Sequence, residues 1–258
     1  MMARMAEDED YFADKTYRGK KFELADFTGA VFKDCDLSGV RVVDTMLTDV
    51  YISGLIRNIV VNDVDVTAYV EGELDRQFPE RAQARSLTTV AEFQAMWDTL
   101  EARWAESVAR AEKLPEEQRQ QGVNGEWSFV ETLRHLVFCT DAWVVRTVLD
   151  EPMPYHRLGY THSGYPAEDA AKLGVDLAAT PSFAEVLEVR RDRMAVIRRI
   201  VDGLTEEELA RLCTRNPAPG YPERPNTVAQ CLGVVMREEA EHRRYAERDL
   251  DILESASS

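Results

Sequence analysis

Glu238 and His242 are the residues of this chain whose types and spacing best suit metal binding. They lie four residues apart in a segment whose apolar residues Val228, Cys231 and Val235 follow helical spacing. Residues i and i+4 of a helix lie one above the other, about 5–6 Å apart, so this carboxylate and this imidazole can converge on one ion. On spacing alone, however, a pair on the helix surface or a satisfied polar contact is the commoner explanation.

A third ligand must come from another helix, and His135 is the candidate. Its helical neighbours Thr132, Phe138, Cys139 and Ala142 give it a mixed face, so periodicity does not decide whether its ring points inward. Cys139 lies four residues further on and could replace a ligand, although a buried structural cysteine is the commoner case.

Several weaker candidates surround these residues. His156 and His162 fall in a long loop, from which they could reach the mouth of the site, although solvent exposure is the commoner outcome. Tyr155, Tyr160 and Tyr165 could line a cleft or anchor that loop, Tyr245 and Asp249 could support the ligands or pack, and Asp141 and Arg146 could form an ion pair.

Four long helices are predicted to position these side chains. Two capping boxes, Ser128 with Glu131 and Ser182 with Glu185, mark clear helix starts. The expected spans are Thr88 to Lys113, Ser128 to Leu149, Ser182 to about Asp202 and Asn226 to about Glu254, with a short helix at Thr205 to Leu212. Connections of uneven length, including a long loop from Asp150 to Thr180, indicate a four-helix bundle.

A five-residue period dominates the first part of the chain. Large apolar residues recur at Phe22, Phe27, Phe32, Leu37, Val42, Leu47 and Ile52, with small or β-branched residues two positions before most of them. This period matches neither a helix nor a strand. It predicts a solenoid that turns a corner every five residues and points both residues inward.

From Lys20 to Gly54 this segment resembles the pentapeptide-repeat family. The resemblance implies a short right-handed quadrilateral β-helix of fewer than two coils, which must lean on the rest of the chain. Residues 59–84 look transitional: Val64 to Gly72 could extend the coil or form a strand, and Pro79 breaks the pattern. The fold class expected is mainly α with a small β part, divided into a tail (1–16), the β-helix and connector (17–84) and the bundle (85–258).

The metal-site residues lie in motifs that resemble the DinB-like bundle superfamily over about Val90 to Leu253. The motifs are Trp127-Ser128, His135-Leu136 and the run from Glu238 to Tyr245. Many members hold a divalent metal with one histidine from the second helix and an HxxxH pair from the last. Glu238 replaces the first histidine of that pair, as in the mycothiol-dependent maleylpyruvate isomerase branch. The resemblance therefore implies His135, Glu238 and His242 as metal ligands.

Three protein ligands leave a coordination position open, which is typical of catalytic zinc. Zinc is the first expectation, and nickel, iron and manganese also suit mixed nitrogen and oxygen ligands. The resemblance implies a metal-dependent transferase or isomerase that uses a low-molecular-weight thiol, such as mycothiol, on a small electrophile. The alternative is a non-catalytic, metal-bearing bundle that acts as an interaction module through the coil. The sequence indicates no residue for binding the thiol or for catalysis.

Composition limits the classes of binding partner that this protein can have. The 258 residues carry a formal net charge of -16, which repels nucleic-acid phosphates and anionic lipid headgroups. The chain has no long apolar run, starts with a polar stretch unlike an export signal, and contains four scattered cysteines. We expect a cytoplasmic protein with a small-molecule substrate and neither nucleic-acid nor membrane partners, and the resemblance allows a homodimer.

Overall fold

The computed structural model describes residue 12 and residues 15–256, and the chain forms two compact units, Met1–Thr45 and Met46–Ser258. In the first unit the five-residue period is visible in the backbone. Left-handed φ values recur at Gly19, Leu24, Gly29, Asp34, Gly39 and Asp44, and the spacing continues at Asp49 and Gly54. Apart from Leu24 these residues are glycines and aspartates, which tolerate this conformation better than most residues, and each position marks a corner of the chain.

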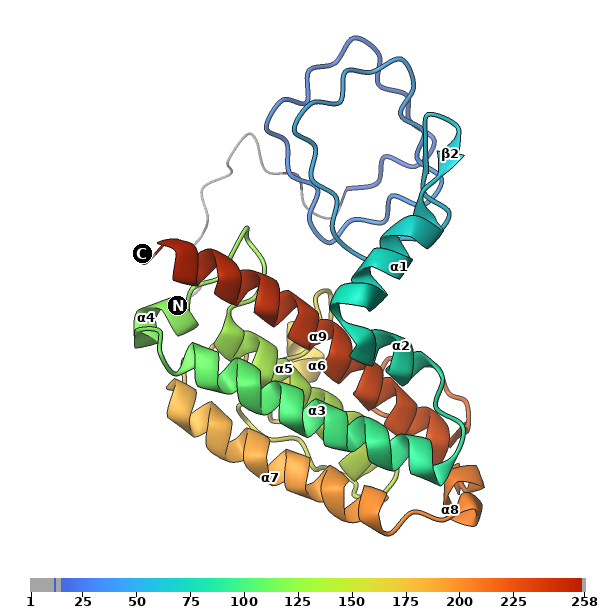
Figure 1. The fold of residues 1–258 in the computed structure, drawn as a ribbon, viewed down its shortest axis with the longest axis vertical. Helices are drawn as coiled ribbons and strands as arrows, with labels where there is room; N and C mark the ends of the chain where they lie inside the picture. Colours follow the sequence, from blue (N-terminus) through green and yellow to red (C-terminus); the bar gives the residue numbers. More distant parts are fainter. Residues whose placement is uncertain (1–11, 13–14, 257–258) are drawn as a thin grey trace. The chain divides into compact units, whose positions relative to one another are not determined.

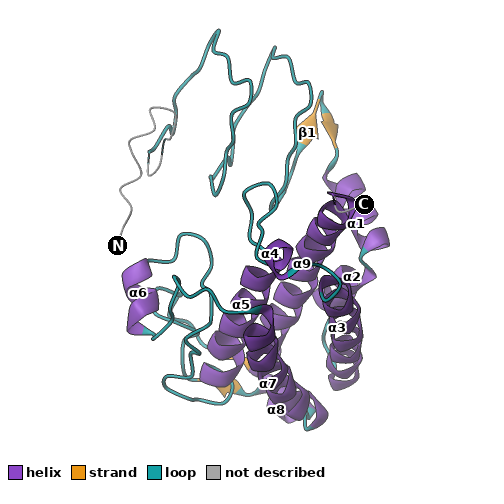
Figure 2. Cartoon of the chain, turned by 90° about the vertical axis from the view of Figure 1, so that its left-hand side faces the viewer, coloured by secondary structure: helices purple, strands orange, loops and turns teal. Residues whose placement is uncertain are grey.

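The expected β-helix is nevertheless not shown. Among the described residues no strand precedes Val60, and Figure 2 draws this segment as loop. The rings of Tyr17, Phe22, Phe27 and Phe32 follow one another, with successive centroids 5.8, 5.6 and 6.2 Å apart. Side chains five residues apart therefore lie next to each other. The seven large apolar side chains of the period, from Phe22 to Ile52, are still 50–70% exposed, whereas a closed solenoid buries its inner row. The five-residue period therefore produces regularly spaced corners in the backbone, but the coil has no packed interior.

The connector is more helical than the sequence indicates. Strand β1 (Val60–Val61) pairs antiparallel with β2 (Val64–Asp65), and helices α1 (Thr67–Gln77) and α2 (Pro79–Arg85) follow. The prediction of a coil or strand from Val64 to Gly72 is thus wrong after Asp65, because helix α1 begins at Thr67. Pro79 starts a helix rather than only breaking a pattern, because the first helical position needs no backbone N–H.

Four long helices form the bundle in the second unit (Figure 1). They are α3 (Val90–Ala111), α5 (Phe129–Thr140), α7 (Phe183–Asp202) and α9 (Val228–Ala256). Each packs against two neighbours: α3 and α5 both contact α7 and α9. The two predicted capping boxes are present, and Thr89 with Glu92 forms a third. The expectation of a mainly helical chain is confirmed.

Helix α5 does not run regularly to Leu149. It continues as a π-helix, η1 (Asp141–Arg146), whose wider turn is common near functional sites. The short elements are α4 (Glu116–Arg119), α6 (Ala167–Lys172), α8 (Glu206–Ala210) and the antiparallel pair β3 (Leu212–Cys213) and β4 (Asn226–Thr227). Within the described residues, no helix combines the length and apolar character that crossing a membrane requires.

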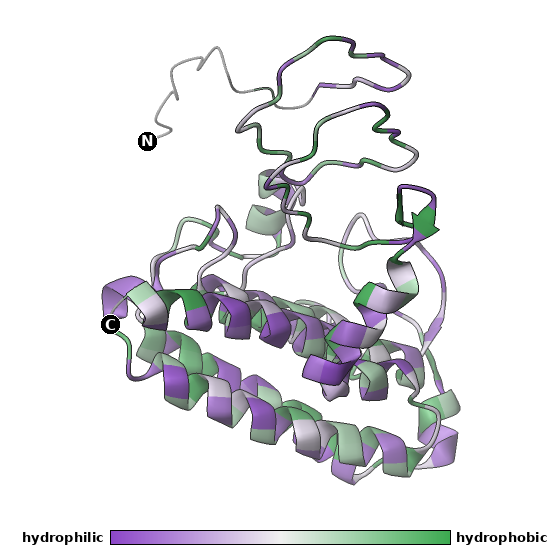
Figure 3. Cartoon of the chain, turned by 45° about the horizontal axis from the view of Figure 1, so that its top comes forward, coloured by the Kyte–Doolittle hydropathy of each residue, from purple (hydrophilic) through white to green (hydrophobic). Residues whose placement is uncertain are grey.

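Apolar stripes of the four helices meet in the core. Trp97, Leu100 and Met236 are fully buried in one cluster, and Leu133 and Leu250 are buried in a second. Figure 3 shows hydrophilic and hydrophobic bands side by side on the helices. Such amphipathic helices derive most of their stability from packing of the apolar face.

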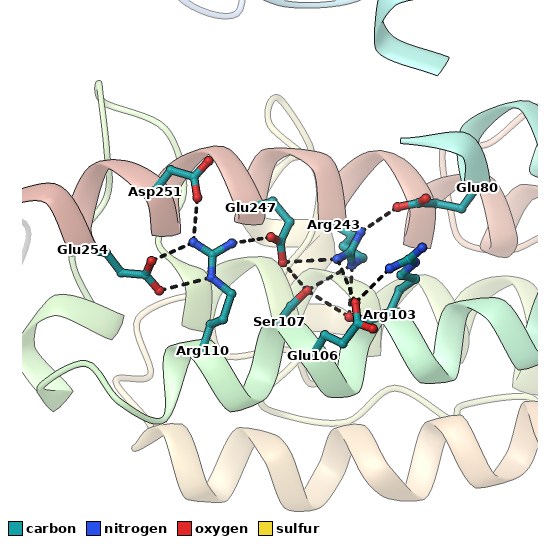
Figure 4. A network of polar contacts seen from close by, with 9 residues as sticks. All are labelled: Glu80, Arg103, Glu106, Ser107, Arg110, Arg243, Glu247, Asp251 and Glu254. Atoms are coloured by element: carbon teal, nitrogen blue, oxygen red, sulfur yellow. Dashed lines mark hydrogen bonds and ion pairs between the residues drawn. The ribbon is translucent and has the colours of Figure 1, made fainter. Parts of the chain in front are cut away.

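A polar network joins α2 and α3 to α9 (Figure 4). Arg243 is buried and donates to Glu80 of α2 at 2.6 Å and to Ser107 of α3 at 3.0 Å. Arg110 of α3 reaches Asp251 at 2.6 Å and also pairs with Glu247. Helix α2 is therefore tied to the bundle by a buried ion pair.

Candidate metal centre

The structure brings the three predicted ligands together between α5 and α9. One ligand atom each of His135, Glu238 and His242 lies within 4.8 Å of the other two. Glu238 Oε2 is 3.7 Å from His135 Nε2 and 3.2 Å from His242 Nε2. The ring of His135 thus faces Glu238 and His242 on the last helix. The helical neighbours of His135 in the sequence did not decide this orientation.

The ring of His135 is held by the long loop. Its Nδ1 lies 2.9 Å from the backbone oxygen of Tyr160. Burial lowers the pKa of His135 despite the nearby carboxylate of Glu238, so the imidazole is neutral. A neutral ring that donates from Nδ1 presents a lone pair at Nε2, which is the form that binds metals.

These donors fit a divalent metal ion. Burial raises the pKa of Glu238, but the neighbouring imidazoles of His135 and His242 outweigh burial and lower the pKa, so the carboxylate is ionised. An unprotonated His135 Nε2 and an ionised carboxylate that face each other suit a cation between them. Two imidazole nitrogens and one carboxylate oxygen form a donor set that suits zinc and related ions.

Trp127 forms a wall beside both imidazoles. Its ring is stacked on that of His242, with centroids 5.7 Å and planes 14° apart, and it lies 4.8 Å from the ring of His135. The ring of Tyr160 meets Trp127 edge-on at 5.6 Å. The sequence motif includes Trp127 but gives no sign of these contacts, which limit the movement of both histidines.

Arg134 fastens the long loop to α5. Its guanidinium is buried and donates to three backbone oxygens, those of Leu158 at 2.9 Å, Asp176 at 2.8 Å and Ala179 at 2.7 Å. Gly159 lies against α5, where an added Cβ would come 3.4 Å from Phe138 Cβ. The loop therefore approaches α5 closely enough to place the Tyr160 carbonyl at His135.

A pocket of about 410 Å³ opens beside the three ligands. Two rows with four-residue spacing line it, one on α5 and η1 and one on α9. The first row is His135, Cys139 and Trp143, the second is Val234, Glu238 and His242, and Trp127, His162, Ser163 and Tyr221 complete the wall. His162 thus reaches the pocket although it is exposed. His156 is not among the lining residues, and its Nδ1 accepts the Leu158 N–H.

A family model described as the DinB superfamily matches residues 99–246, more than half of the chain. The chain belongs to the DinB superfamily. The matched span includes His135, Glu238 and His242. Searches of curated proteins and of solved structures gave no match.

In this DinB bundle Cys139 touches the site without joining the ligand group. Its Sγ lies 3.2 Å from His135 Nε2, and it is not one of the three residues whose donor atoms converge. Burial raises the pKa of the Cys139 thiol, so the thiol donates to the imidazole lone pair. This contact and metal binding use the same lone pair and exclude each other.

Two buried ion pairs beside the DinB site were missed from the sequence. Glu239, next to Glu238, is fully buried and pairs with Arg190 of α7. Asp141 is also fully buried and accepts from Arg193 Nε at 2.5 Å. The expected pair of Asp141 with Arg146 is wrong, because the Asp141 carboxylate faces α7 and pairs with Arg193 there. Arg146 instead donates to the backbone oxygen of Asn216.

The remaining candidates support the DinB site only indirectly. The ring of Tyr245 lies 6.3 Å from that of His242. Asp249 forms an ion pair with Arg248 at 2.6 Å. Tyr155 is buried against Phe138 and Tyr165 donates to the backbone oxygen of Pro219 at 3.1 Å, so both anchor loops.

Proposed function

We propose that this protein is a metal-dependent enzyme that uses a low-molecular-weight thiol of the mycothiol kind in S-transfer or isomerisation on a small electrophile. The observation that carries the proposal is the convergence of His135, Glu238 and His242 at a pocket of about 410 Å³. A divalent ion held there supplies Lewis acidity and lowers the pKa of a thiol or water that reaches it. Zinc is our first choice, and nickel, iron and manganese also suit these donors.

The chain's own groups divide the work at this site. The Tyr160 carbonyl keeps the His135 proton at Nδ1, so that Nε2 stays available. The Glu238 carboxylate offsets part of the charge of a divalent cation. Trp127 covers one side of both imidazoles and limits the access of water to them. The pocket then binds and orients the organic ligands.

The thiol part of the proposal rests on the His/Glu/His set, which resembles the maleylpyruvate isomerase branch of the superfamily. A net charge of -16 disfavours nucleic-acid and membrane partners, so the proposed partner is a small molecule, and pairing into a homodimer is compatible with it. All four cysteines are unpaired, which suits the reducing cytoplasm that we propose as its location.

Elemental analysis of the untagged protein tests the proposal. The comparison is wild type, His135→Ala and Glu238→Ala, with His162→Ala as a control that alters the pocket wall but no ligand. We expect about one equivalent of a transition metal in wild type and the control, and little in the two ligand variants. Absence of metal in the wild type, even after reconstitution, would refute the proposal. Metal-loaded protein that neither binds nor consumes any small thiol would refute its thiol part.

A second function is favoured by one observation, the half-exposed apolar row of the coil. In this alternative the segment is a pentapeptide-repeat β-helix through which a non-catalytic bundle docks to a partner. Removing residues 1–45 tests it, because a cut at residue 85 would also delete Glu80 and leave Arg243 buried without that partner. Unchanged metal binding with loss of a co-purifying partner supports docking, and unchanged binding with no partner in the full chain counts against it.

A further inference from the structure

We infer that the pocket beside the metal site selects ligands with an uncharged, flat aromatic tail and rejects tails that carry a carboxylate. The inference rests on the proposed function, because the thiol head of the ligand is placed at the ion. It adds the chemical class of the tail, which the three metal ligands do not define.

The pocket has two different ends. His135 and His242 face each other with ring centroids 4.7 Å apart, and Trp127 covers them. Trp143 and Val234 lie eight residues from His135 and His242 along their helices, which is about 12 Å at 1.5 Å per residue. A ligand whose head is at the ion therefore extends its tail toward Trp143 and Val234.

The far end is an aromatic corner. The rings of Trp143 and Tyr221 stand at 83° to each other with centroids 5.7 Å apart. His162 meets Tyr221 at 78° and 6.1 Å. Two perpendicular faces allow a flat ring to stack on one and to present its edge to the other, and both arrangements are favourable. Val234 adds an aliphatic contact from α9.

This end offers no permanent positive charge to a ligand. Among the described residues that line the pocket there is no lysine or arginine, and Glu238 is the only carboxylate. Three arginines on neighbouring turns are engaged elsewhere: Arg134 with backbone oxygens, Arg190 with Glu239 and Arg193 with Asp141. Arg237 of α9 is exposed and is not among the residues that line the pocket. A carboxylate on the tail would lose hydration without gaining a lysine or arginine partner. The aromatic corner and the missing cation favour the same class of ligand.

Three thiols with one head and different tails test the inference on the metal-loaded full chain. 4-Phenylbutane-1-thiol carries an uncharged ring on a linker long enough to reach from the ion to the aromatic corner, 4-(4-mercaptobutyl)benzoate adds a carboxylate too distant to chelate the ion, and butane-1-thiol lacks the ring. Cobalt(II) in the site gives an absorption spectrum that reports each thiol's binding directly. We expect 4-phenylbutane-1-thiol to bind about tenfold or more tightly than either of the others.

Variants separate the effect of the aromatic corner from the effect of the missing cation. Trp143→Ala should abolish most of the preference for 4-phenylbutane-1-thiol over butane-1-thiol, whereas Tyr221→Phe keeps the ring and should keep the preference. Val234→Arg adds a cation and should bring the benzoate to at least the affinity of 4-phenylbutane-1-thiol. Equal or tighter binding of the benzoate by metal-loaded wild type would overturn the inference and leave the proposed function standing. If the wild type holds no metal, the proposed function fails and the inference with it.

Discussion

The backbone oxygen of Tyr160 lies 2.9 Å from Nδ1 of His135, so a loop residue fixes the tautomer of a residue on α5. The same peptide segment is bound in the other direction, since the Tyr160 N–H donates to the Arg134 oxygen at 3.1 Å. The N–H and the C=O of Tyr160 therefore both hold the loop in position against α5. The metal site consequently depends on the position of a segment that contributes no ligand.

Gly159→Ala should weaken metal binding without altering a ligand. The added methyl group would come 3.1 Å from the His156 oxygen and 3.4 Å from Phe138 Cβ, which displaces the Tyr160 carbonyl. Loss of such an outer hydrogen bond typically costs about 10- to 100-fold in metal affinity. Competition with a chromophoric chelator measures it. Gly72→Ala, which meets nothing within 4 Å, is the control, and equal affinities in the two variants would contradict this role of the loop.

Arg190→Met should lower the free energy of unfolding by about 3 to 5 kcal/mol, because it leaves the fully buried Glu239 carboxylate without its partner. The double variant Arg190→Met with Glu239→Leu should be clearly more stable than that single variant, since no buried charge remains. Urea unfolding of metal-free protein gives both values. A single variant as stable as the double would show that the pair is not desolvated.

Asp141 should make stability fall as the pH rises from about 4 to 6. Burial raises the pKa of Asp141 from 3.8 to about 6, although Arg193 opposes the shift. The unfolded chain therefore loses this proton first, and a contribution of up to about 3 kcal/mol is lost across that range. The test is the difference in unfolding free energy between metal-free wild type and Asp141→Asn at each pH. A difference that stays constant from pH 4 to 6 would contradict the raised pKa.

Cys139→Ala should retain the full metal content. The thiol bonds to His135 Nε2, the same lone pair that the ion would use, so its removal eliminates a competitor and not a ligand. Metal affinity should be equal to or slightly above that of the wild type. Elemental analysis and chelator competition provide the measurements. Loss of the metal would instead identify Cys139 as a ligand.

The sequence predicted the elements that depend on local signals. Capping boxes at Ser128 and Ser182 located the starts of α5 and α7, because a side chain three residues away suffices to form them. The helical spacing of Glu238 and His242 placed two donors on one face. The inward direction of His135 depended on how α5 packs against α9, which no local pattern contains.

Other features could not be read from residue types. Tyr160 acts through its backbone carbonyl, a group that every residue carries. Glu239 and Glu238 are adjacent and chemically identical, and only the packing of α9 assigns one to the core and the other to the pocket. In the coil, the five-residue spacing predicted the corners, but packing of the apolar row requires contacts beyond the repeat itself.

The donors on α5 and α9 lie more than a hundred residues apart in the chain. An ion held by both helices would act as a cross-link that closes a very long loop, and such closure restricts the unfolded chain most. Because unfolded chains seldom preserve such a site, binding free energy adds directly to folding free energy. The persistence of this bundle in a cell would then rise and fall with the free concentration of its metal.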